Sequence, residues 1–176
     1  EDKDSEDVRA IKVKRVDKTF PNYYRRRVAF CIGINNYPNL PTLEYAVKDA
    51  KDIAGVLKGY DFDEVSLLTD ARATKQTIVN ELLRFKSESE ENDLFVFYFA
   101  GHGTAVSDHE GKERGYLIPV DFKDENNIDE QGISMGLFKD ICDTMPNKHI
   151  LFLVDCCYSG YGLTRSYAIK KEPEGD

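Results

Sequence analysis

One stretch constrains the fold of this chain more than any other: residues 149–160, His-Ile-Leu-Phe-Leu-Val-Asp-Cys-Cys-Tyr-Ser-Gly. Five apolar residues run from Ile150 to Val154 and end in an acid, two cysteines, a tyrosine, a serine and a glycine. A short apolar run bounded by turn residues predicts a strand that is buried on both faces of a sheet. The acid and the cysteines then lie at the carboxyl end of that strand, which is where open α/β sheets bind ligands.

Two other apolar runs also predict buried strands, at residues 28–34 and 94–99, and residues 65–68 predict a short strand. Helical spacing of apolar residues separates them, from Leu43 to Gly59, after a Thr74 N-cap, and after a Ser134 N-cap. We expect residues 101–133 to be a long loop with one short apolar piece at residues 116–120. Strands that alternate with helices predict an α/β fold, with a mainly parallel sheet between helices on both faces.

The composition narrows the classes of function. Acidic residues outnumber basic ones by 32 to 24, and the formal net charge of −8 gives no support for a nucleic-acid partner. The cysteines lack the paired spacing of a zinc site and fit reduced thiols in the cytoplasm; they are Cys31, Cys142, Cys156 and Cys157. No apolar stretch approaches the roughly 20 residues that span a bilayer, so no membrane contact is expected.

Two of the predicted strands lead into reactive residues. The strand at residues 94–99 leads to His102, and the strand at residues 150–154 leads to Cys157, 55 positions later. A spacing of roughly 50 residues, with the histidine first, is typical of caspase-type thiol proteases. If the strands are neighbours, His102 can move protons for a thiol nucleophile, and the N–H groups of Gly103 and Cys157 can hold an oxyanion.

Other interpretations of these residues stay open. Cys156 is a rival nucleophile, because adjacent side chains on a strand face opposite sides and spacing alone does not choose between the two thiols. His102 would otherwise cap a tight turn, and Cys157 would be a small buried apolar residue. Asp49 and Asp155, taken alone, are an exposed helix acid and a strand-end turn former.

Four ordered motifs resemble the caspase-like cysteine peptidases, with metacaspases, paracaspases and their prokaryotic relatives as the nearest branch. The motifs are Val28-Ala29-Phe30-Cys31-Ile32-Gly33-Ile34-Asn35-Asn36-Tyr37, Tyr98-Phe99-Ala100-Gly101-His102-Gly103, Tyr116-Leu117-Ile118-Pro119-Val120-Asp121 and Asp155-Cys156-Cys157-Tyr158-Ser159-Gly160. The resemblance implies the caspase-haemoglobinase fold, a three-layer αβα sandwich. It also implies a dyad of His102 and Cys157, because the family's nucleophile stands two residues after the acid.

The resemblance further implies a preference for basic substrates. Residues 41–44 contain no arginine where caspases hold a substrate aspartate, whereas Asp49 and Asp155 match the two acids that line the specificity pocket of metacaspases. Two carboxylates in such a pocket would bind a guanidinium through charge-assisted bonds. No cofactor is expected. The family's calcium-binding acids are poorly matched, with Arg114 and Thr164 at two of their positions and only Asp129 and Glu130 as partial candidates.

The resemblance also implies a division of the chain. We expect a charged, solvated arm over residues 1–27, a catalytic large-subunit domain over residues 28–165, and a tail or linker remnant over residues 166–176. Only 19 residues follow Cys157, too few for the family's small subunit, so a small-subunit chain is an expected partner and homodimerisation is left open.

These observations predict a cytoplasmic cysteine endopeptidase that cleaves protein or peptide substrates after arginine, less often lysine, and is activated by processing or by a partner. One alternative is an inactive caspase-like scaffold that binds partners. The other is an aspartate-specific protease of the caspase type.

Overall fold

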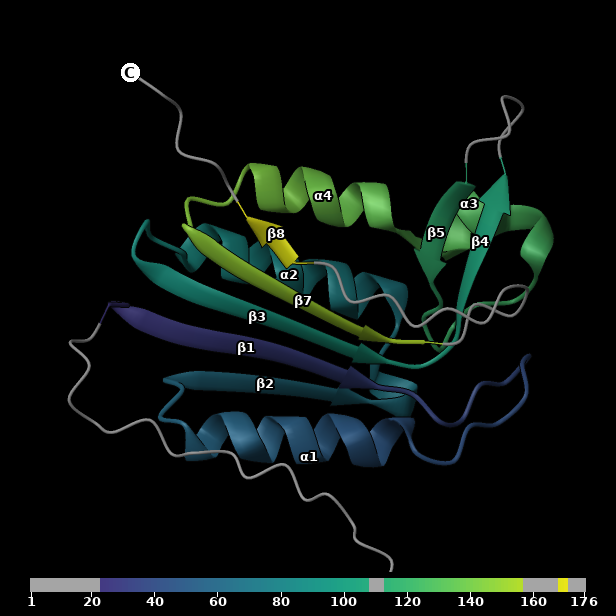
Figure 1. The fold of residues 1–176 in the computed structure, drawn as a ribbon. Coiled ribbons are helices and arrows are strands. Elements are labelled where there is room, and N and C mark those ends of the chain that lie inside the picture. Colours follow the sequence, from purple (N-terminus) through teal and green to yellow (C-terminus); the bar gives the residue numbers. More distant parts are fainter. Residues whose placement is uncertain (1–22, 108–112, 157–167, 171–176) are drawn as a thin grey trace, which may run out of the picture.

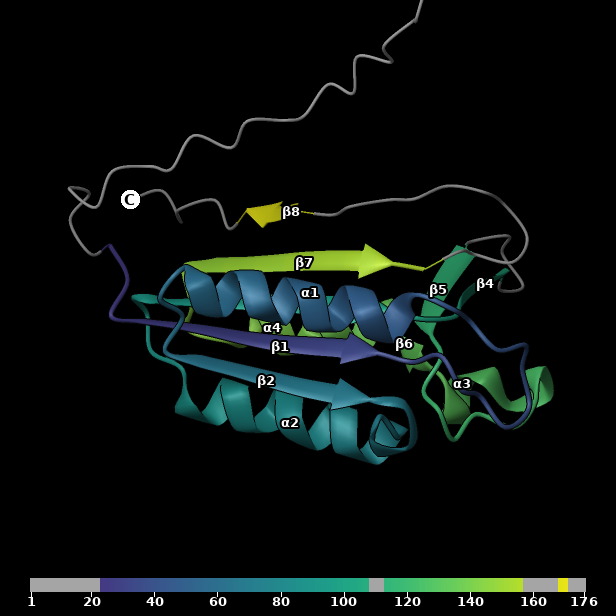
Figure 2. The same ribbon diagram turned by 90° about the horizontal axis from the view of Figure 1, so that it is seen from below.

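The computed structural model describes residues 23–107, 113–156 and 168–170, which form an α/β sandwich of three layers (Figure 1). The central sheet has four parallel strands and one antiparallel edge strand. Their order, labelled in Figure 1, is β2 (Glu64–Thr69), β1 (Arg26–Gly33), β3 (Asp93–Ala100), β7 (His149–Asp155) and β8 (Ala168–Lys170). Figure 2 shows β8 beside β7 at one edge and β2 at the other. The predicted α/β class with a mainly parallel sheet is confirmed.

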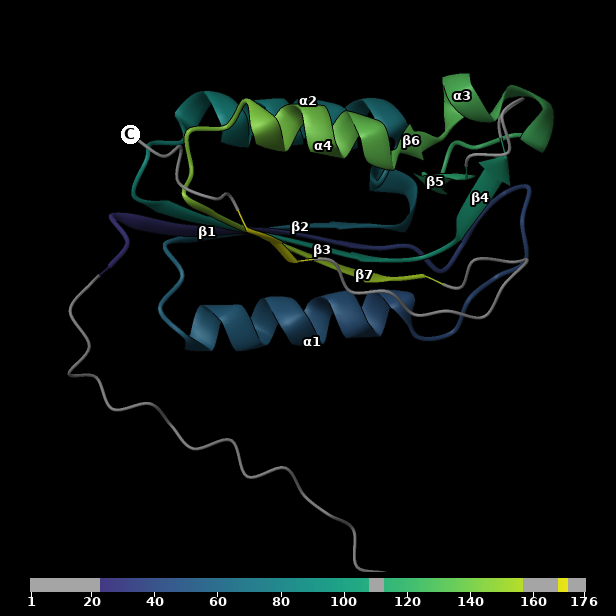
Figure 3. The same ribbon diagram turned by 45° about the horizontal axis from the view of Figure 1, so that its top comes forward.

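Helices cover both faces of the sheet (Figure 3). One face carries α1 (Ala46–Gly59), and the other carries α2 (Lys75–Glu88) and α4 (Met135–Asp143). Both predicted N-caps are confirmed, because the hydroxyl of Thr74 accepts from the Thr77 N–H at 3.2 Å and that of Ser134 accepts from the Leu137 N–H at 3.1 Å. Among the described residues, no helix has the length and apolar character needed to cross a bilayer.

The two faces of the sheet are packed differently. Toward α2 and α4 the core is aromatic, with ring centroids 4.8–5.9 Å apart among Phe30, Phe85, Phe95, Phe97, Phe138 and Phe152. Toward α1 the core is made of small residues, including Ala46 and Ala50. A Cβ atom at Gly33 would lie 2.5 Å from the Ala46 carbonyl oxygen, so β1 needs a glycine where α1 crosses it. The start of α1 is thereby held close to the carboxyl end of β1.

The prediction that residues 101–133 form a long loop was wrong in part. A small antiparallel sheet occupies much of this segment, built from β4 (Gly103–Ser107), β5 (Glu113–Leu117) and β6 (Ile133–Ser134). The same segment also holds a 3-10 turn at Glu125–Asn127 and the short helix α3 at Ile128–Gln131; a further 3-10 turn, at Asp70–Arg72, lies between β2 and α2. The strands escaped prediction because β4 is buried only at its first residue, so it lacks an apolar pattern.

The boundaries at both ends of the domain also differ from expectation. β1 begins at Arg26, inside the expected arm, and β8 lies within the expected tail. The basic triplet at residues 25–27 is only partly solvated. Arg25 makes a bidentate pair with the buried carboxylate of Asp93, at 2.9 and 2.6 Å, which ties the start of the domain to β3.

Candidate active site

The carboxyl ends of β3 and β7 lie side by side. The two strands are parallel neighbours, and Ala100 pairs with Asp155 at the last position of the ladder. Just beyond it, the Gly101 N–H donates to the Asp155 carbonyl at 3.2 Å. The condition on which the sequence argument depended, that these strands are neighbours, is therefore met. Cys157 lies outside the described residues; in the sequence it follows Asp155 by two positions, as His102 follows Ala100.

His102 is half-buried and held through its backbone and its ring. Its Nε2 lies 2.8 Å from the carbonyl oxygen of Pro41. A carbonyl can only accept, so Nε2 carries the proton, and in the neutral ring Nδ1 is the nitrogen left able to accept one. The ring of Tyr37 packs against the imidazole with centroids 4.7 Å apart. The surroundings of His102 thus specify which nitrogen is available as a base.

The backbone N–H of Gly103, the predicted oxyanion donor, has an orientation that is set by the ladder between β4 and β5. Gly103 pairs with Leu117 at the start of β4, next to the bond from the Ile118 N–H to the His102 carbonyl at 3.0 Å. Antiparallel ladders alternate between hydrogen-bonded and non-hydrogen-bonded pairs. Because His102 and Ile118 are a hydrogen-bonded pair, the next pair, Gly103 and Leu117, is a non-hydrogen-bonded one. The Gly103 N–H therefore points away from β5.

Cys156, the rival nucleophile, packs into the core. Its side chain is 6% exposed and belongs to the cluster between the sheet and the helices α2 and α4. A Cβ atom at Gly103 would lie 2.6 Å from its Sγ, so the sulfur rests directly against the start of β4. This close packing gives Cys156 a structural role in the described part of the chain.

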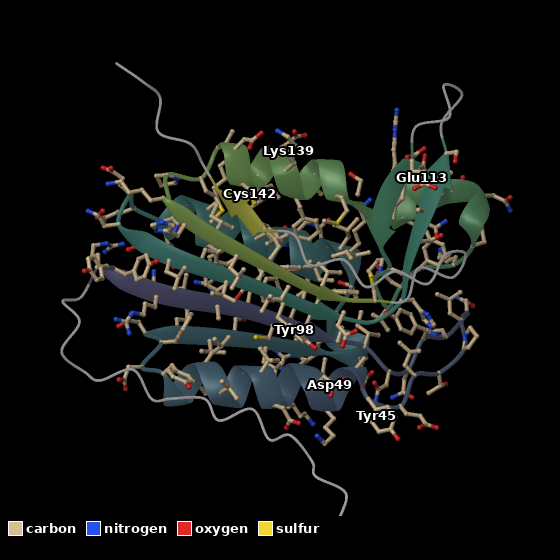
Figure 4. All side chains as sticks on the ribbon, in the orientation of Figure 1. Tyr45, Asp49, Tyr98, Glu113, Lys139 and Cys142 are labelled. Carbon is tan, nitrogen blue, oxygen red and sulfur yellow. The ribbon has the colours of Figure 1, made fainter. Side chains whose placement is uncertain are left out.

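The two predicted specificity acids approach a common neighbour. Tyr98 lies on β3 toward α1, and Figure 4 shows it with Asp49 at the junction of the sheet and that helix. Burial raises the pKa of Tyr98 above its ordinary value, and the negative charges of Asp155 and then Asp49 raise it further. Both carboxylates thus act electrostatically on one phenol; Asp49 is half-buried in the first turn of α1, and Asp155 is exposed at the end of β7.

Asn35 connects the histidine's surroundings with the acidic helix. Its side chain accepts from the Val47 N–H at 3.0 Å and donates to the Glu44 carbonyl at 3.2 Å, which caps the start of α1. Its backbone N–H donates to the carboxylate of Asp70 at 2.8 Å. The connection from β1 to α1 is thus held at both ends, and it presents Pro41 to His102. By residue type, the start of this connection, Asn35-Asn36-Tyr37-Pro38, indicates a turn.

The remaining described thiols are unsuited to attack. Burial raises the pKa of Cys31 to about 11 and that of Cys142 to about 12, so both remain protonated near neutral pH. Within residues 23–107, 113–156 and 168–170, no three His, Cys, Asp or Glu side chains are grouped to hold a metal ion. Asp129, a partial calcium candidate, accepts a hydrogen bond from the Tyr116 hydroxyl.

Comparison with known proteins identifies the family. A family model described as the caspase domain matches residues 26–176. The chain belongs to the caspase-domain peptidases. Among curated relatives, this caspase domain is similar to Metacaspase-1 of Scheffersomyces stipitis, with 26% identity over 88% of this chain and 42% of the relative. It is also similar to Metacaspase-1A of Aspergillus fumigatus, with 28% identity over 84% of this chain and 40% of the relative.

A solved structure shares the fold of this caspase domain. The crystal structure of a protein from Geobacter sulfurreducens superimposes with a TM-score of 0.64 and 17% identity, covering 77% of this chain and 52% of that one. The family assignment and the observed layers agree with the predicted caspase-haemoglobinase fold. The chain spans about two fifths of the length of the curated relatives named above.

Proposed function

We propose that this caspase domain is the large-subunit portion of a cysteine endopeptidase that cleaves after arginine and, less often, after lysine. The pairing of Ala100 with Asp155 in neighbouring strands carries the proposal. It brings the segment that bears His102 beside the segment that leads to Cys157. A thiol with an imidazole at hand is the combination that thiol proteases use.

In the proposed reaction, Nδ1 of His102 accepts the proton of the Cys157 thiol. The thiolate sulfur then bonds to the carbonyl carbon of the scissile peptide, and the N–H groups of Gly103 and Cys157 stabilise the oxyanion. The C–N bond breaks as His102 passes its proton to the leaving amine. Water next attacks the thioester and gives a proton to His102, and breakage of the S–C bond returns that proton to sulfur.

The proposed preference for a basic residue rests on Asp49 and Asp155. Their carboxylates approach the same end of the sheet from α1 and from β7, near the Tyr98 hydroxyl. A guanidinium presents five N–H donors in a planar fork and can bond two carboxylates at once. The ammonium of lysine has three donors on a more flexible stem, which accounts for its second rank.

The proposal includes partners and a compartment. The substrates are proteins or peptides with exposed basic residues, and a small-subunit segment completes the fold after processing or partner binding. The greater length of the relatives supports a further segment of this kind. We also assign the domain to the cytoplasm, where thiols such as Cys31 and Cys142 stay reduced.

The test compares four proteins on two substrates. Full-length wild type, Cys157→Ala, Cys156→Ala and His102→Ala are assayed with fluorogenic peptides that end in arginine or in aspartate. We expect arginine-directed cleavage that is abolished in Cys157→Ala and His102→Ala and retained within about twofold in Cys156→Ala. Loss in Cys156→Ala alone would overturn the assignment of the nucleophile, and preferential cleavage after aspartate would overturn the specificity. Absence of cleavage by the activated wild type would favour the scaffold alternative.

A further inference from the structure

The hydroxyl of Tyr37 is inserted between the backbones of His102 and Ile118, one position beyond the ladder of β4 and β5. In a hydrogen-bonded antiparallel pair, two residues exchange both backbone bonds. Here the Ile118 N–H donates directly to the His102 carbonyl at 3.0 Å. The reciprocal connection runs through the phenol: the His102 N–H donates to the Tyr37 oxygen at 3.0 Å, and the Tyr37 O–H donates to the Ile118 carbonyl at 3.1 Å. The phenol oxygen therefore sets the spacing of the backbone at His102.

The same tyrosine also contacts the imidazole. Its ring lies 4.7 Å from that of His102 between centroids, with an interplanar angle of 56°. Pro41, four residues further along the same connection, holds Nε2 through its carbonyl at 2.8 Å. The connection from β1 to α1 thus fixes His102 at its backbone N–H, at its ring face and at Nε2.

The environment of Tyr37 keeps the phenol in the form that this role requires. The residue is 6% exposed, and burial raises the pKa of its hydroxyl above the ordinary value, so the group stays protonated and can donate and accept together. The backbone before the histidine is shaped around it, because a Cβ atom at Gly101 would lie 2.6 Å from the Tyr37 oxygen. A buried phenylalanine would fill the same space without the two hydrogen bonds.

We propose that Tyr37 is a positioning residue for His102, and that its hydroxyl sets the distance and orientation of the imidazole relative to the attacking thiol. The inference rests on the proposed function, which makes His102 the acid and base. Without the hydroxyl, the His102 N–H can bond the Ile118 carbonyl directly, which draws the start of β4 toward β5 and displaces the imidazole. A displacement of about 1 Å in a catalytic group can cost roughly 100-fold in rate.

The experiment uses Tyr37→Phe in the full-length protein with an arginine-terminated fluorogenic peptide. We expect kcat to fall roughly 10- to 100-fold while KM stays within about twofold, because the bonds to the substrate side chain are untouched. We also expect the pH profile of kcat to shift from that of the wild type. Tyr60→Phe, at the exposed end of α1, is the matched control and keeps kcat, KM and the pH profile.

Two more variants complete the test: Gly101→Ala as a second variant and His102→Ala as the reference. Gly101→Ala presses on the same hydroxyl without removing it, so it gives a kinetic result even if Tyr37→Phe folds poorly by circular dichroism. We expect the same loss of kcat at near-constant KM. Wild-type kcat and pH profile in either folded variant would overturn the inference. Retained turnover in His102→Ala would instead overturn the proposed function, so the two failures are distinguishable.

Discussion

Ala100 and Asp155 are direct partners at the carboxyl ends of the neighbouring parallel strands β3 and β7. The sequence shows only that 55 positions separate His102 from Cys157, whereas this register shows that the segments leading to them are neighbours. His102 and Cys157 each follow their paired residue by two positions. The proposed catalysis requires this equivalence of position.

Neutralising either specificity acid should weaken recognition of arginine. A hydrogen bond to a charged group contributes about 1.5–3 kcal/mol, so Asp49→Asn and Asp155→Asn should each lower kcat/KM for an arginine substrate roughly 10- to 100-fold. Steady-state kinetics on both peptides measure this effect. Asp52→Asn is the control, since Asp52 lies on the same helix but is exposed and paired with Lys48. An equal loss in the control would contradict the assignment.

Removing the side-chain cap of α1 should affect both stability and kinetics. Loss of a capping side chain costs about 0.5–2 kcal/mol, so Asn35→Ala and Thr74→Ala should show similar decreases in the free energy of unfolding in urea. Only Asn35→Ala should also raise KM for arginine peptides, because Asn35 caps the helix that carries Asp49. A raised KM in Thr74→Ala would show that the kinetic effect follows general destabilisation.

The ion pairs of Arg84 should stabilise the fold only above acidic pH. Hydrogen bonds from Arg84 lower the pKa of Glu81 and of Glu88. A lowered folded-state pKa gives stability that is present above the unfolded pKa and is lost as pH falls through the folded value. Arg84→Met should therefore destabilise the protein more at pH 7 than at pH 3.

Chemical denaturation at the two pH values measures the difference. Part of the destabilisation in Arg84→Met should be the same at both pH values, because the guanidinium also lies 4.2 Å from the centroid of the Phe85 ring. Lys139→Met removes an exposed pair with Asp143 and should change the stability by no more than about 1 kcal/mol at either pH. Equal destabilisation of Arg84→Met at pH 7 and pH 3 would refute the electrostatic interpretation.

Adding a methyl group at the start of β4 should collide with Cys156. Gly103→Ala places a Cβ 2.6 Å from the Sγ of Cys156, and overpacking of this kind costs about 1–3 kcal/mol. The double variant Gly103→Ala with Cys156→Ala should lose less stability than the sum of the single variants, since it removes the sulfur. Additive losses in thermal unfolding would show that the two residues are not in contact.

The sequence predicted the layers of the fold and the approximate places of the main strands because apolar periodicity carries that information. The run from Ile150 to Val154 forms a strand, and the caps at Thr74 and Ser134 lie where their patterns indicated. The prediction that this strand is buried on both faces was wrong, because Phe152 is the one buried residue of β7 and Leu151 is exposed. The small sheet was missed because its strands are short, mostly exposed and paired with one another, so no burial pattern marks them.

The sequence indicates candidate reactive side chains by their residue types, but it does not indicate the groups that hold them in place. Histidine, cysteine and paired acidic residues suggest catalysis or the binding of a cation by their residue types alone. The partner of Nε2 is a backbone carbonyl, that of Pro41, and any residue could supply it. The roles of Tyr37 and Asn35 depend on contacts with His102, Ile118 and Val47, distant in sequence or across a turn, which only the folded chain reveals.

The central claim is that the thiol at position 157, and not its buried neighbour, is the nucleophile. Its most direct test is to react the activated full-length protein with an arginine chloromethyl ketone and to locate the adduct by fragment mass spectrometry. The account predicts one adduct, on Cys157, that is lost in His102→Ala at matched reagent and time. An adduct on Cys156, or labelling of Cys157 at the same rate without His102, would contradict it.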